Sequence, residues 1–355
     1  MPDGRSFPAS HRRHIASMNV TIKDVARAAE VSVATVSRAL NGRQYVAEDV
    51  RARILQVASE LRYSPHHAAR ALSSRRTHTI GVVLPDLYGE FFSELMRGID
   101  HAARERGLHL LVSSCHGSLA EQRDALRATP GRVDGVLVMS PFLGSVESLD
   151  EALVPDVPAV LMNCAGSPRA AVLNVDNHGG AFTMTRHLLE VGHRRIAFIA
   201  GPEDNFDARE RLRGYQDALA TVADAAAPWV VPGNFDEASG YAAGEAFAAG
   251  ERPDAVFAAN DMTALGCLFA LRKAGLRVPE DIAVAGFDDV PMARYVNPAL
   301  TTMRVDIASL GARALHLLLQ HPGLGGESGT PVDTAPLIPQ LVVRDSSAIP
   351  ERRMA

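Results

Sequence analysis

Cysteine and long apolar runs are scarce in this chain of 355 residues. Its three cysteines, at positions 115, 164 and 267, have no paired spacing, which excludes a disulfide framework or a cysteine zinc site and fits a reducing compartment. No apolar run has membrane-spanning length, and residues 1–17 lack the apolar core of a signal peptide. We therefore expect a cytoplasmic protein with no membrane partner.

Motifs for catalysis and nucleotide binding are also lacking. The sequence has no G-x-S-x-G, Walker A or H-E-x-x-H pattern, and its only lysines, Lys23 and Lys273, lie outside any phosphate-binding loop. The glycine-rich stretch 322–329 narrowly misses a dinucleotide fingerprint and opens no strand-to-helix turn, so we interpret it as a loop. These features predict a protein that is not an enzyme, with no catalytic residues, no metal site and no cofactor.

Charge is distributed unevenly along the chain. The whole chain carries a net charge of −5, but residues 1–78 contain 13 Arg and Lys against 6 Asp and Glu, a net +7. The remaining residues contain 23 basic and 35 acidic residues, a net −12. A basic head on an acidic body indicates that only the head binds a polyanion, although a solvated basic surface would give the same count.

Residues 21–40 have the pattern of a helix-turn-helix. Thr21 and Asp24 form a short capping box that begins one helix, and Ser32 can cap a second helix that Asn41-Gly42 ends. Only three residues join the two apolar stripes, so the chain must turn sharply between them. Any two short amphipathic helices with a tight turn would also fit, but the coincidence with the basic head favours a DNA-binding motif.

The second of these helices has a face that packing does not require. Val33, Ala34, Ser37 and Arg38 lie opposite its apolar side. Small side chains beside one arginine suit the major groove, where arginine can pair with guanine through two hydrogen bonds.

The rest of the chain is predicted to form a third helix, a linker and two series of alternating strands and helices. Residues 46–62 have helical apolar spacing, and residues 64–79 have little to bury and form a linker that could fold on binding. From residue 80, short β-branched apolar runs alternate with amphipathic helices, and a second such series begins near residue 177. This pattern predicts two similar lobes with parallel sheets, and a ligand cleft at the carboxyl ends of the strands.

Ordered motifs along the chain resemble the LacI family of bacterial transcriptional regulators. They include TIKDVARAAEVSVATVSRALNG, YSPHHAARALSSRRTHTIGVVLPD, VDGVLVMSP, GHRRIAFIAGP, AANDMTALG, LRVPEDIAVAGFDD and NPALTTMRVD, over residues 20 to about 347. The resemblance implies a homodimeric repressor with a small all-α helix-turn-helix head and a two-lobed, periplasmic-binding-protein-like α/β core with three crossovers. A periplasmic sugar-binding protein would need a signal peptide and would have no use for the basic head.

The resemblance also implies an organisation of the chain. We expect a disordered extension over 1–18, of which residues 1–17 are dispensable, a DNA-binding domain over 19–64, a hinge helix and linker over 65–78 and a core over 79–347. The expected lobes are 79–176 with 305–331, and 177–302 with 332–346. We see no heptad extension after residue 347, which favours a dimer over a tetramer.

DNA contacts carry over from the family by matching position. Val33, Ala34 and Arg38 would read the major groove, and Leu72 would wedge into the minor groove at the centre of a pseudo-palindromic operator in double-stranded DNA. The full expected set is Thr21, Ser32, Val33, Ala34, Thr35, Ser37, Arg38, Asn41, Tyr63, Ala69 and Leu72. One departure is Glu30, where many members have Gly or Asn, and a left-handed backbone there would cost about 1 kcal/mol.

Polar and aromatic residues at strand ends and in the turns that follow them are the candidates for binding a small-molecule effector. They are Phe91, Phe92, Asn163, Asn205, Asp207, Arg211, Phe235, Asn260, Asp261 and Asp288. Phe92 could instead be core, Asp261 a helix cap and Asn163 a turn residue. Arg211 and Asp288 are the strongest, since their family counterparts commonly contact the effector. We also expect both to lie at polar strand ends outside the core, so that either could be removed without unfolding the protein.

The candidate residues favour a neutral, polyhydroxylated effector. The purine repressor of the family has arginine at the position of Asn205 and threonine at that of Asp207, which argues against a purine here. A carboxylate accepts hydrogen bonds from two hydroxyls well, so we expect a mono- or disaccharide and a repressor of carbohydrate-utilisation genes. A purine- or nucleoside-responsive repressor is the alternative.

Overall fold

The computed structural model describes residues 20–40, 46–63, 76–142, 146–326 and 333–347. The chain divides into two compact units, residues 1–75 and 76–355, which we call the head and the core. The expectations for residues 1–18, Asn41, Ala69 and Leu72 lie outside the described residues. No helix within the described ranges is long and apolar enough to cross a membrane.

Three helices form the head, and the first two begin where the sequence predicted. They are α1 (Ile22–Ala28), α2 (Val33–Leu40) and α3 (Glu48–Glu60). The Asp24 carboxylate accepts hydrogen bonds from the Thr21 backbone N–H at 3.0 Å and from its hydroxyl at 2.6 Å. The Ser32 hydroxyl accepts from the Thr35 backbone N–H at 3.1 Å and so caps α2. The third helix is two residues shorter at each end than predicted.

The turn between α1 and α2 requires a left-handed residue. Glu30 has φ +53°, which confirms the conformation expected at the position where relatives often have glycine. Val25 and Val36, on either side of the turn, pack with Ile54 of α3 in a small buried core. The packing of the three helices therefore fixes the turn, and with it the left-handed conformation of the exposed Glu30.

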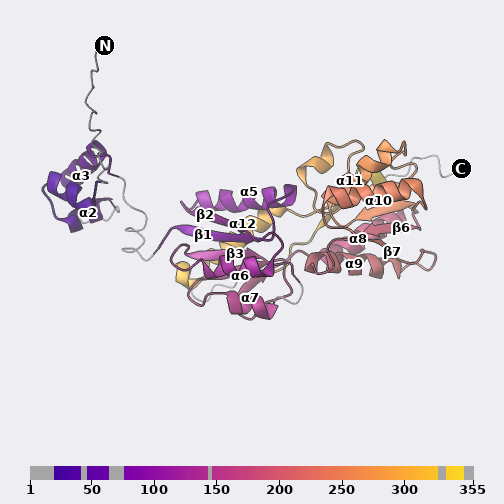
Figure 1. Cartoon of the computed structure of the whole chain (residues 1–355), viewed down its shortest axis with the longest axis horizontal. Helices are drawn as coiled ribbons and strands as arrows, with labels where there is room; N and C mark the ends of the chain where they lie inside the picture. The colour runs from indigo at the N-terminus through magenta and orange to yellow at the C-terminus, as the bar shows by residue number, and fades with distance from the viewer. Residues whose placement is uncertain (1–19, 41–45, 64–75, 143–145, 327–332, 348–355) are drawn as a thin grey trace, which may run out of the picture. The chain divides into compact units, whose positions relative to one another are not determined.

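The core contains two lobes, each built on a parallel sheet (Figure 1). The sheet of lobe 1 has the order β2-β1-β3-β4-β5, and every pair in it is parallel. Its elements are β1 (Thr79–Leu84), α5 (Glu90–Arg104), β2 (His109–Ser114), α6 (Leu119–Arg127), β3 (Gly135–Met139), α7 (Val146–Ala152), β4 (Ala159–Met162), β5 (Ala171–Leu173) and α12 (Ile307–Leu319). β1 and β3 are almost completely buried, as expected for strands covered on both faces.

Lobe 2 repeats this design with a four-stranded sheet, in the order β7-β6-β8-β9. Its elements are α8 (Asn177–Glu190), β6 (Ile196–Ile199), α9 (Phe206–Leu219), β7 (Trp229–Val231), α10 (Glu237–Ala249), β8 (Ala255–Ala258), α11 (Asp261–Lys273), β9 (Ala283–Ala285) and the 3₁₀ turn η1 (Pro291–Arg294). All neighbouring strands in this sheet are parallel, which confirms the predicted α/β class.

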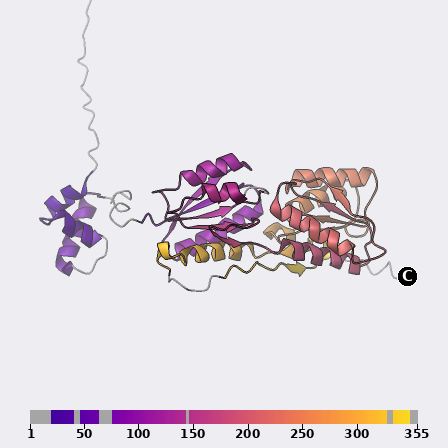
Figure 2. The same cartoon turned by 90° about the horizontal axis from the view of Figure 1, so that it is seen from below.

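The last part of the chain passes between the lobes in both directions. The short strands β10 (Thr302–Arg304) and β11 (Gln340–Val342) form an antiparallel pair beside lobe 2. Between them the chain returns to lobe 1, where α12 packs against α5, as Figure 2 shows from below. With the segment between β5 and α8, this gives three crossovers: residues 174–176, 305–306 and 333–339. The sequence analysis did not predict the three-residue strands β5, β10 and β11.

Candidate functional site

The outward face of α2 carries the residues expected to read DNA. Val33, Ala34 and Arg38 are exposed and Ser37 is half-buried, while Val36 and Ala39 on the opposite side are buried. Arg38 lies in the last turn of the helix. The helix thus presents small side chains and one arginine to solvent, with its apolar side held by α1 and α3.

Other residues of the expected DNA-binding set have structural contacts in the head. Thr21 and Ser32 engage in capping, and the Thr35 hydroxyl lies 2.8 Å from that of Ser32. The half-buried Tyr63 packs against the head's apolar core, and its backbone N–H donates to Ala58 O at 2.8 Å. Capping and packing are compatible with a phosphate contact but do not require one.

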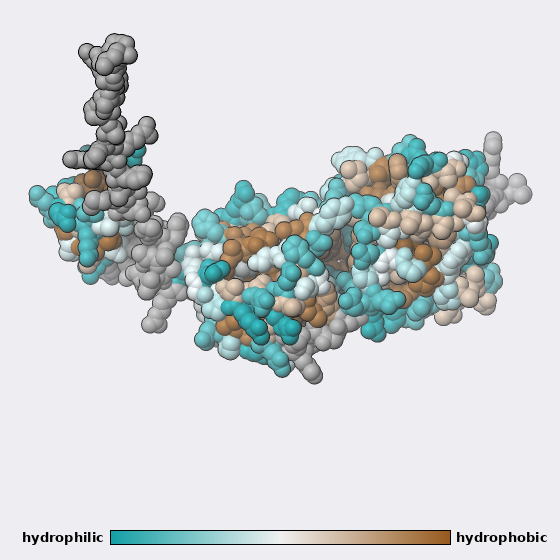
Figure 3. Space-filling view, in the orientation of Figure 1, coloured by the Kyte–Doolittle hydropathy of each residue, from teal (hydrophilic) through white to brown (hydrophobic). Residues whose placement is uncertain are grey.

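A cavity of about 560 Å³ lies between the two lobes of the core. Figure 3 shows the surface hollowed where the lobes meet. Nine of the ten candidate effector residues line this cavity: Phe91, Phe92, Asn163, Asn205, Asp207, Arg211, Phe235, Asn260 and Asp288. They come together because the carboxyl ends of the parallel strands of both lobes face this space. A volume of this size suits a small organic molecule.

Backbone strain concentrates around the cavity. Four lining residues other than glycine have positive φ: His116 (46°), Asn163 (51°), Phe235 (61°) and Asp288 (114°). Such conformations cost about 1–3 kcal/mol each and persist where surrounding contacts fix them. The strained turns aim these side chains into the space between the lobes.

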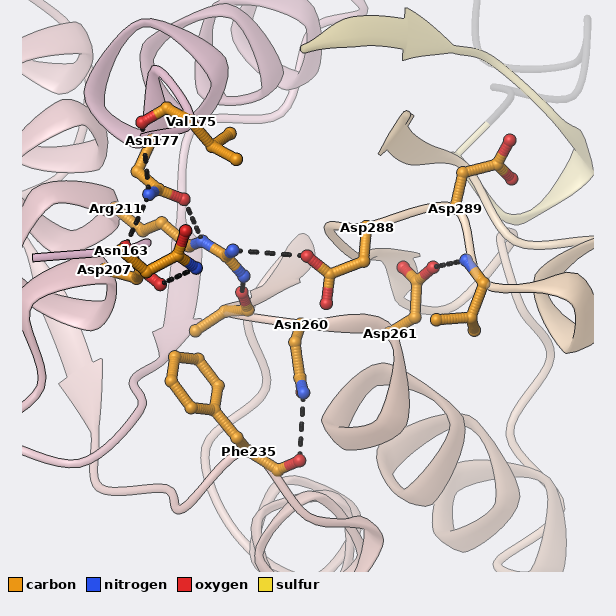
Figure 4. Close-up of polar contacts among 12 residues, drawn as sticks. Asn163, Val175, Asn177, Asp207, Arg211, Phe235, Asn260, Asp261, Asp288 and Asp289 are labelled. Atoms are coloured by element: carbon orange, nitrogen blue, oxygen red, sulfur yellow. Dashed lines mark hydrogen bonds and ion pairs between the residues drawn. The ribbon is translucent and has the colours of Figure 1, made fainter. Parts of the chain in front are cut away.

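Arg211 is the central side chain of the site (Figure 4). It projects from α9 and its side chain is only 5% exposed. Its Nε donates to Asn177 Oδ1 at 2.8 Å and its Nη1 to the Ala259 carbonyl at 2.6 Å. The guanidinium stacks 3.9 Å from the centroid of the Phe287 ring. Arg211 is therefore part of the core packing of lobe 2, which corrects the expectation that it lies outside the core.

Two buried carboxylates face this arginine. Asp288 Oδ1 forms an ion pair with Arg211 Nη2 at 3.2 Å, with both side chains nearly fully buried. Asp207 accepts hydrogen bonds from Asn163 Nδ2 at 2.7 Å and from Asn177 Nδ2 at 2.8 Å. Burial raises the pKa of Asp207, against the nearby charge of Arg211, and raises the pKa of Asp288 to about 6. The site holds more negative than positive charge.

Two buried oxygen atoms at the site have unused acceptor capacity. Neither Asn163 Oδ1 nor Asp288 Oδ1 has a hydrogen-bond partner among the residues that the structure describes. A buried acceptor without a donor costs about 1–3 kcal/mol. Both atoms belong to residues that line the cavity, although the atoms themselves are buried.

Aromatic rings and helix caps complete the lining. The half-buried rings of Phe91 and Phe92 meet edge to face, with centroids 5.5 Å apart, and Phe235 lies 5.6 Å below the Arg211 guanidinium. Asn205 caps α9 by accepting from Ala208 N–H at 3.1 Å. Asn260 caps α11, and its Nδ2 holds the Phe235 carbonyl at 2.9 Å. The two asparagines thus fix the turns that carry the cavity lining.

Asp261 does not line the cavity, and this corrects its inclusion among the effector residues. Its side chain is completely buried, and its two oxygens accept from Thr302 Oγ1 at 2.6 Å and Val290 N–H at 2.9 Å. Burial, with the charges of Asp288 and Asp289 nearby, raises its pKa well above the ordinary value. The first residue of α11 faces the interior, while the preceding Asn260 faces the cavity.

Sequence reasoning also missed two contributors. Asn177, the first residue of α8, bridges Arg211 and Asp207 through its amide. Tyr88 lines the cavity from lobe 1, and its hydroxyl donates to the carboxylate of Glu237 on lobe 2 at 3.2 Å. Asn177 lies at the start of a helix, where the strand-end signal does not apply, whereas Tyr88 lies in the turn after β1 and that signal could have found it. Among the described residues there is no group of His, Cys, Asp and Glu side chains that could hold a metal ion.

Comparison with known proteins identifies both units. Residues 21–66 match the family described as bacterial regulatory proteins, lacI family, and residues 185–347 match the periplasmic binding protein-like domain. The HTH-type transcriptional repressor PurR of Aliivibrio fischeri (strain MJ11) is 36% identical over 308 residues, which cover 84% of this chain and 91% of that protein.

Two solved structures are similar along nearly the whole chain. The Lac repressor dimer bound to operator and the anti-inducer ONPF superposes with a TM-score of 0.82 at 28% identity, covering 93% of this chain and 99% of that one. The complex of the transcriptional regulator CelR with cellobiose gives a TM-score of 0.66 at 34% identity, covering 92% and 99%. The chain therefore belongs to the LacI family of bacterial regulatory proteins, and it is a DNA-binding transcriptional repressor and not an enzyme.

Proposed function

We propose that this repressor is a homodimer that binds a pseudo-palindromic operator in the cytoplasm and controls carbohydrate-utilisation genes. A neutral mono- or disaccharide bound between the lobes would change its affinity for the operator. The observation that carries the choice of effector is the pair of buried acceptor oxygens on Asn163 and Asp288 that accept no hydrogen bond, although the Asp288 oxygen is ion-paired with Arg211. Sugar hydroxyls are donors of the kind that these two oxygens lack.

The charge around the cavity favours a neutral sugar over an anionic one. One arginine, Arg211, lines the cavity together with five aspartates: Asp86, Asp204, Asp207, Asp236 and Asp288. A phosphate or carboxylate on the ligand would add repulsion to a site that already has an acidic excess. Ionised carboxylates accept hydrogen bonds strongly, so the same excess suits a ligand rich in hydroxyls.

Each lining group has a role in this proposal. Asp288 would accept from hydroxyls, and Arg211 would donate its remaining N–H groups to ring or hydroxyl oxygens. Asp207 and Asn163 would bind a second pair of hydroxyls, and Asn205 and Asn260 would keep their turns in place. Phe91, Phe92 and Phe235 would provide the apolar surface that the C–H face of a sugar ring requires.

The relatives support both this effector class and its alternative. CelR, which is similar over almost the whole chain, was solved with cellobiose. The similarity to PurR favours the second candidate, a repressor that responds to a purine or nucleoside. Two observations support the sugar. Asn205 and Asp207 differ from the residues of the purine repressor at these positions, and aspartates outnumber arginines in the cavity lining.

A dimer would place one head on each half-site of the operator. The Lac repressor in the similar structure is a dimer on its operator. Apolar side chains also reach the surface of lobe 1 beside β2 (Figure 3), where Leu111 and Val112 are exposed on an edge strand. We infer that a second copy of the chain covers this apolar surface beside β2. Ala69 and Leu72, which follow the head in the sequence, would contact the minor groove. Asn41 would contact DNA at the end of α2.

The DNA-reading role of α2 can be tested at Arg38. Arg38→Ala should weaken operator binding by about 1–3 kcal/mol and relax preference at one base pair per half-site. Arg27→Ala, which removes an exposed arginine of α1, is the matched control and should leave base preference intact. Both variants would be measured by fluorescence anisotropy on operator and random duplexes. An equal loss on both duplexes for Arg38→Ala would show that this residue only contacts phosphate.

The effector class can be tested by thermal shift with a defined panel. Cellobiose, ribose, glucose, glucose 6-phosphate, guanine and hypoxanthine would be screened against the full chain, because a ligand that binds only the native state raises its melting temperature. We expect a neutral sugar to stabilise the protein and Asp288→Asn to abolish that shift. Asp217→Asn, an exposed acid of α9, is the control. Stabilisation by guanine or hypoxanthine with no sugar response would establish the alternative.

A further inference from the structure

Asp288 and Asp289 are consecutive residues whose side chains point in opposite directions. Figure 4 shows the Asp288 carboxylate directed at Arg211 and that of Asp289 on the far side of the strand end. Both are buried, and both have positive φ, at 114° and 55°. Two consecutive left-handed residues other than glycine are costly, so surrounding contacts must hold this segment in place.

Asp289 is fixed by arginines from two other segments. Its Oδ2 accepts from Arg304 Nε at 2.7 Å, and its Oδ1 accepts from Arg344 Nη2 at 2.6 Å. Arg294 lies at 4.0 Å from Oδ2. The Asp289 side chain is 1% exposed, and charge-assisted hydrogen bonds to a carboxylate this deeply buried are among the stronger polar contacts in a protein.

Both arginines lie on segments that connect the lobes. Arg304 is the last residue of β10, directly before the crossover at 305–306 that leads to α12 of lobe 1. Arg344 follows β11, which the chain reaches through the crossover at 333–339. Arg344 also donates from Nη1 to the Leu300 carbonyl at 2.7 Å. One carboxylate thus joins the ends of two of the three crossovers.

The backbone of Asp288 is tied to the same crossover. Its N–H donates to the Met303 carbonyl at 2.8 Å, and its own carbonyl accepts from Val305 N–H at 3.2 Å. A change in the peptide between Asp288 and Asp289 must therefore displace either β10 or the residues that follow it. The other neighbour, Val290, is held by Asp261.

We propose that Asp289 is a positioning residue that transmits a change at Asp288 in the cavity to the crossovers at 305–306 and 333–339. This rests on the proposed function, in which an effector contacts Asp288. Asp289 itself does not line the cavity. Its loss should uncouple the two crossovers from occupation of the cavity, with the ligand contacts left in place.

The test uses the full chain with Arg304→Gln, since the Arg304 side chain is 47% exposed and its loss should leave the fold intact. Asp289→Asn is the second variant. The matched control is Arg277→Gln, which breaks a lobe 2 ion pair of the same 2.7 Å length, with Asp281, away from the cavity lining and the crossovers. Circular dichroism would verify folding.

The first measurement needs no ligand. Amide hydrogen exchange of residues 286–290 and 303–307 should accelerate by about tenfold in Arg304→Gln, the effect of losing one charge-assisted hydrogen bond, and should not change in Arg277→Gln. Unchanged exchange in both Arg304→Gln and Asp289→Asn would overturn the proposal, whatever the effector is.

The second measurement is the ratio of operator affinities with and without each of cellobiose, ribose and hypoxanthine at saturation. In Arg304→Gln this ratio should fall at least about fivefold, while the affinity for the compound itself changes less than about threefold. An unchanged ratio, or an equal loss of compound binding, would overturn the proposal. If no compound changes operator binding in the unmodified protein, the proposed function fails, and the exchange data alone decide the role of Asp289.

Discussion

The carboxylate of Asp288 combines burial with an incomplete set of hydrogen bonds. Burial raises its pKa to about 6, and the carboxylate of Asp207 adds to this, while Arg211 opposes it. For Asp288 the raised pKa means stability that is present below about pH 4 and is lost as the pH rises through about 6. The ligand-free protein therefore pays for an ionised Asp288 at neutral pH, and a donor ligand would recover part of that cost.

We accordingly predict that effector affinity falls as the pH drops below about 6. Hydroxyls bind the ionised carboxylate, so protonation should weaken binding by up to about tenfold per pH unit. Isothermal titration in buffers of different ionisation enthalpy should also detect proton release on binding near pH 6. Asp288→Asn should remove this dependence, and Asp207, whose pKa is also raised, would account for any that remains. An affinity independent of pH between 5 and 7 would contradict the role of Asp288.

Glu30 is a second residue held in an unfavourable state by its surroundings. Its φ of +53° suits glycine, and the tight turn between α1 and α2 imposes it. We predict that Glu30→Gly stabilises the head by about 0.5–1 kcal/mol, because relief of the left-handed strain exceeds the added chain entropy of glycine. Native-state hydrogen exchange of α1 and α2 would measure this. Glu30→Ala retains the Cβ atom and should give no gain, so equal stabilisation by both variants would implicate the side chain instead.

At the scale of elements, α10 and α11 pack closely enough to require glycine. A Cβ on Gly266 would lie 2.0 Å from the Glu237 carbonyl oxygen, and one on Gly240 would lie 1.9 Å from that of Thr263. Backbone atoms cannot yield as a flexible side chain can. The two helices support the turns at Phe235 and Asn260, so their separation bears on the shape of the cavity.

Gly266→Ala should therefore destabilise lobe 2 by about 1–3 kcal/mol. Denaturant unfolding can be followed through Trp229, whose ring meets Phe247 of α10 edge to face at 5.5 Å. Ala242→Ser, on the exposed side of α10, is a control that should change stability by less than about 0.5 kcal/mol. Helix propensity alone predicts stabilisation by about 1 kcal/mol from glycine to alanine, so a gain in stability would show that the helices can separate freely.

For the whole molecule, the head and the core are separate compact units, so communication between them must be measured as a coupling free energy. We predict that the effector changes operator affinity and that the operator changes effector affinity by the same factor, about 5–150-fold. Titrating the sugar with and without a saturating operator duplex gives one factor, and titrating operator with and without sugar gives the other. Unequal factors would reveal a further linked equilibrium, such as dissociation of the dimer.

Local and periodic features of the sequence were sufficient to predict the starts of two helices, the two parallel sheets and most of the cavity lining. The starts of α1 and α2 depend on capping contacts within three residues, and both formed as predicted. The parallel sheets follow from buried strands alternating with helices. Nine of ten effector candidates line the cavity, because parallel strands place their carboxyl ends at a common edge whatever the details of packing.

Tertiary structure alone decided which neighbour of a pair faces the cavity and which faces the interior. Asn260 and Asp261 are adjacent, yet only Asp261 turns inward, to partners 29 and 41 residues away. In the same way, Asp288 faces the cavity and Asp289 faces the interior. The two arginines that bind Asp289 lie 15 and 55 residues after it in the sequence. Periodicity fixes a residue's position along an element. Its partners depend on where the crossovers bring distant segments, and the local sequence carries no signal for that.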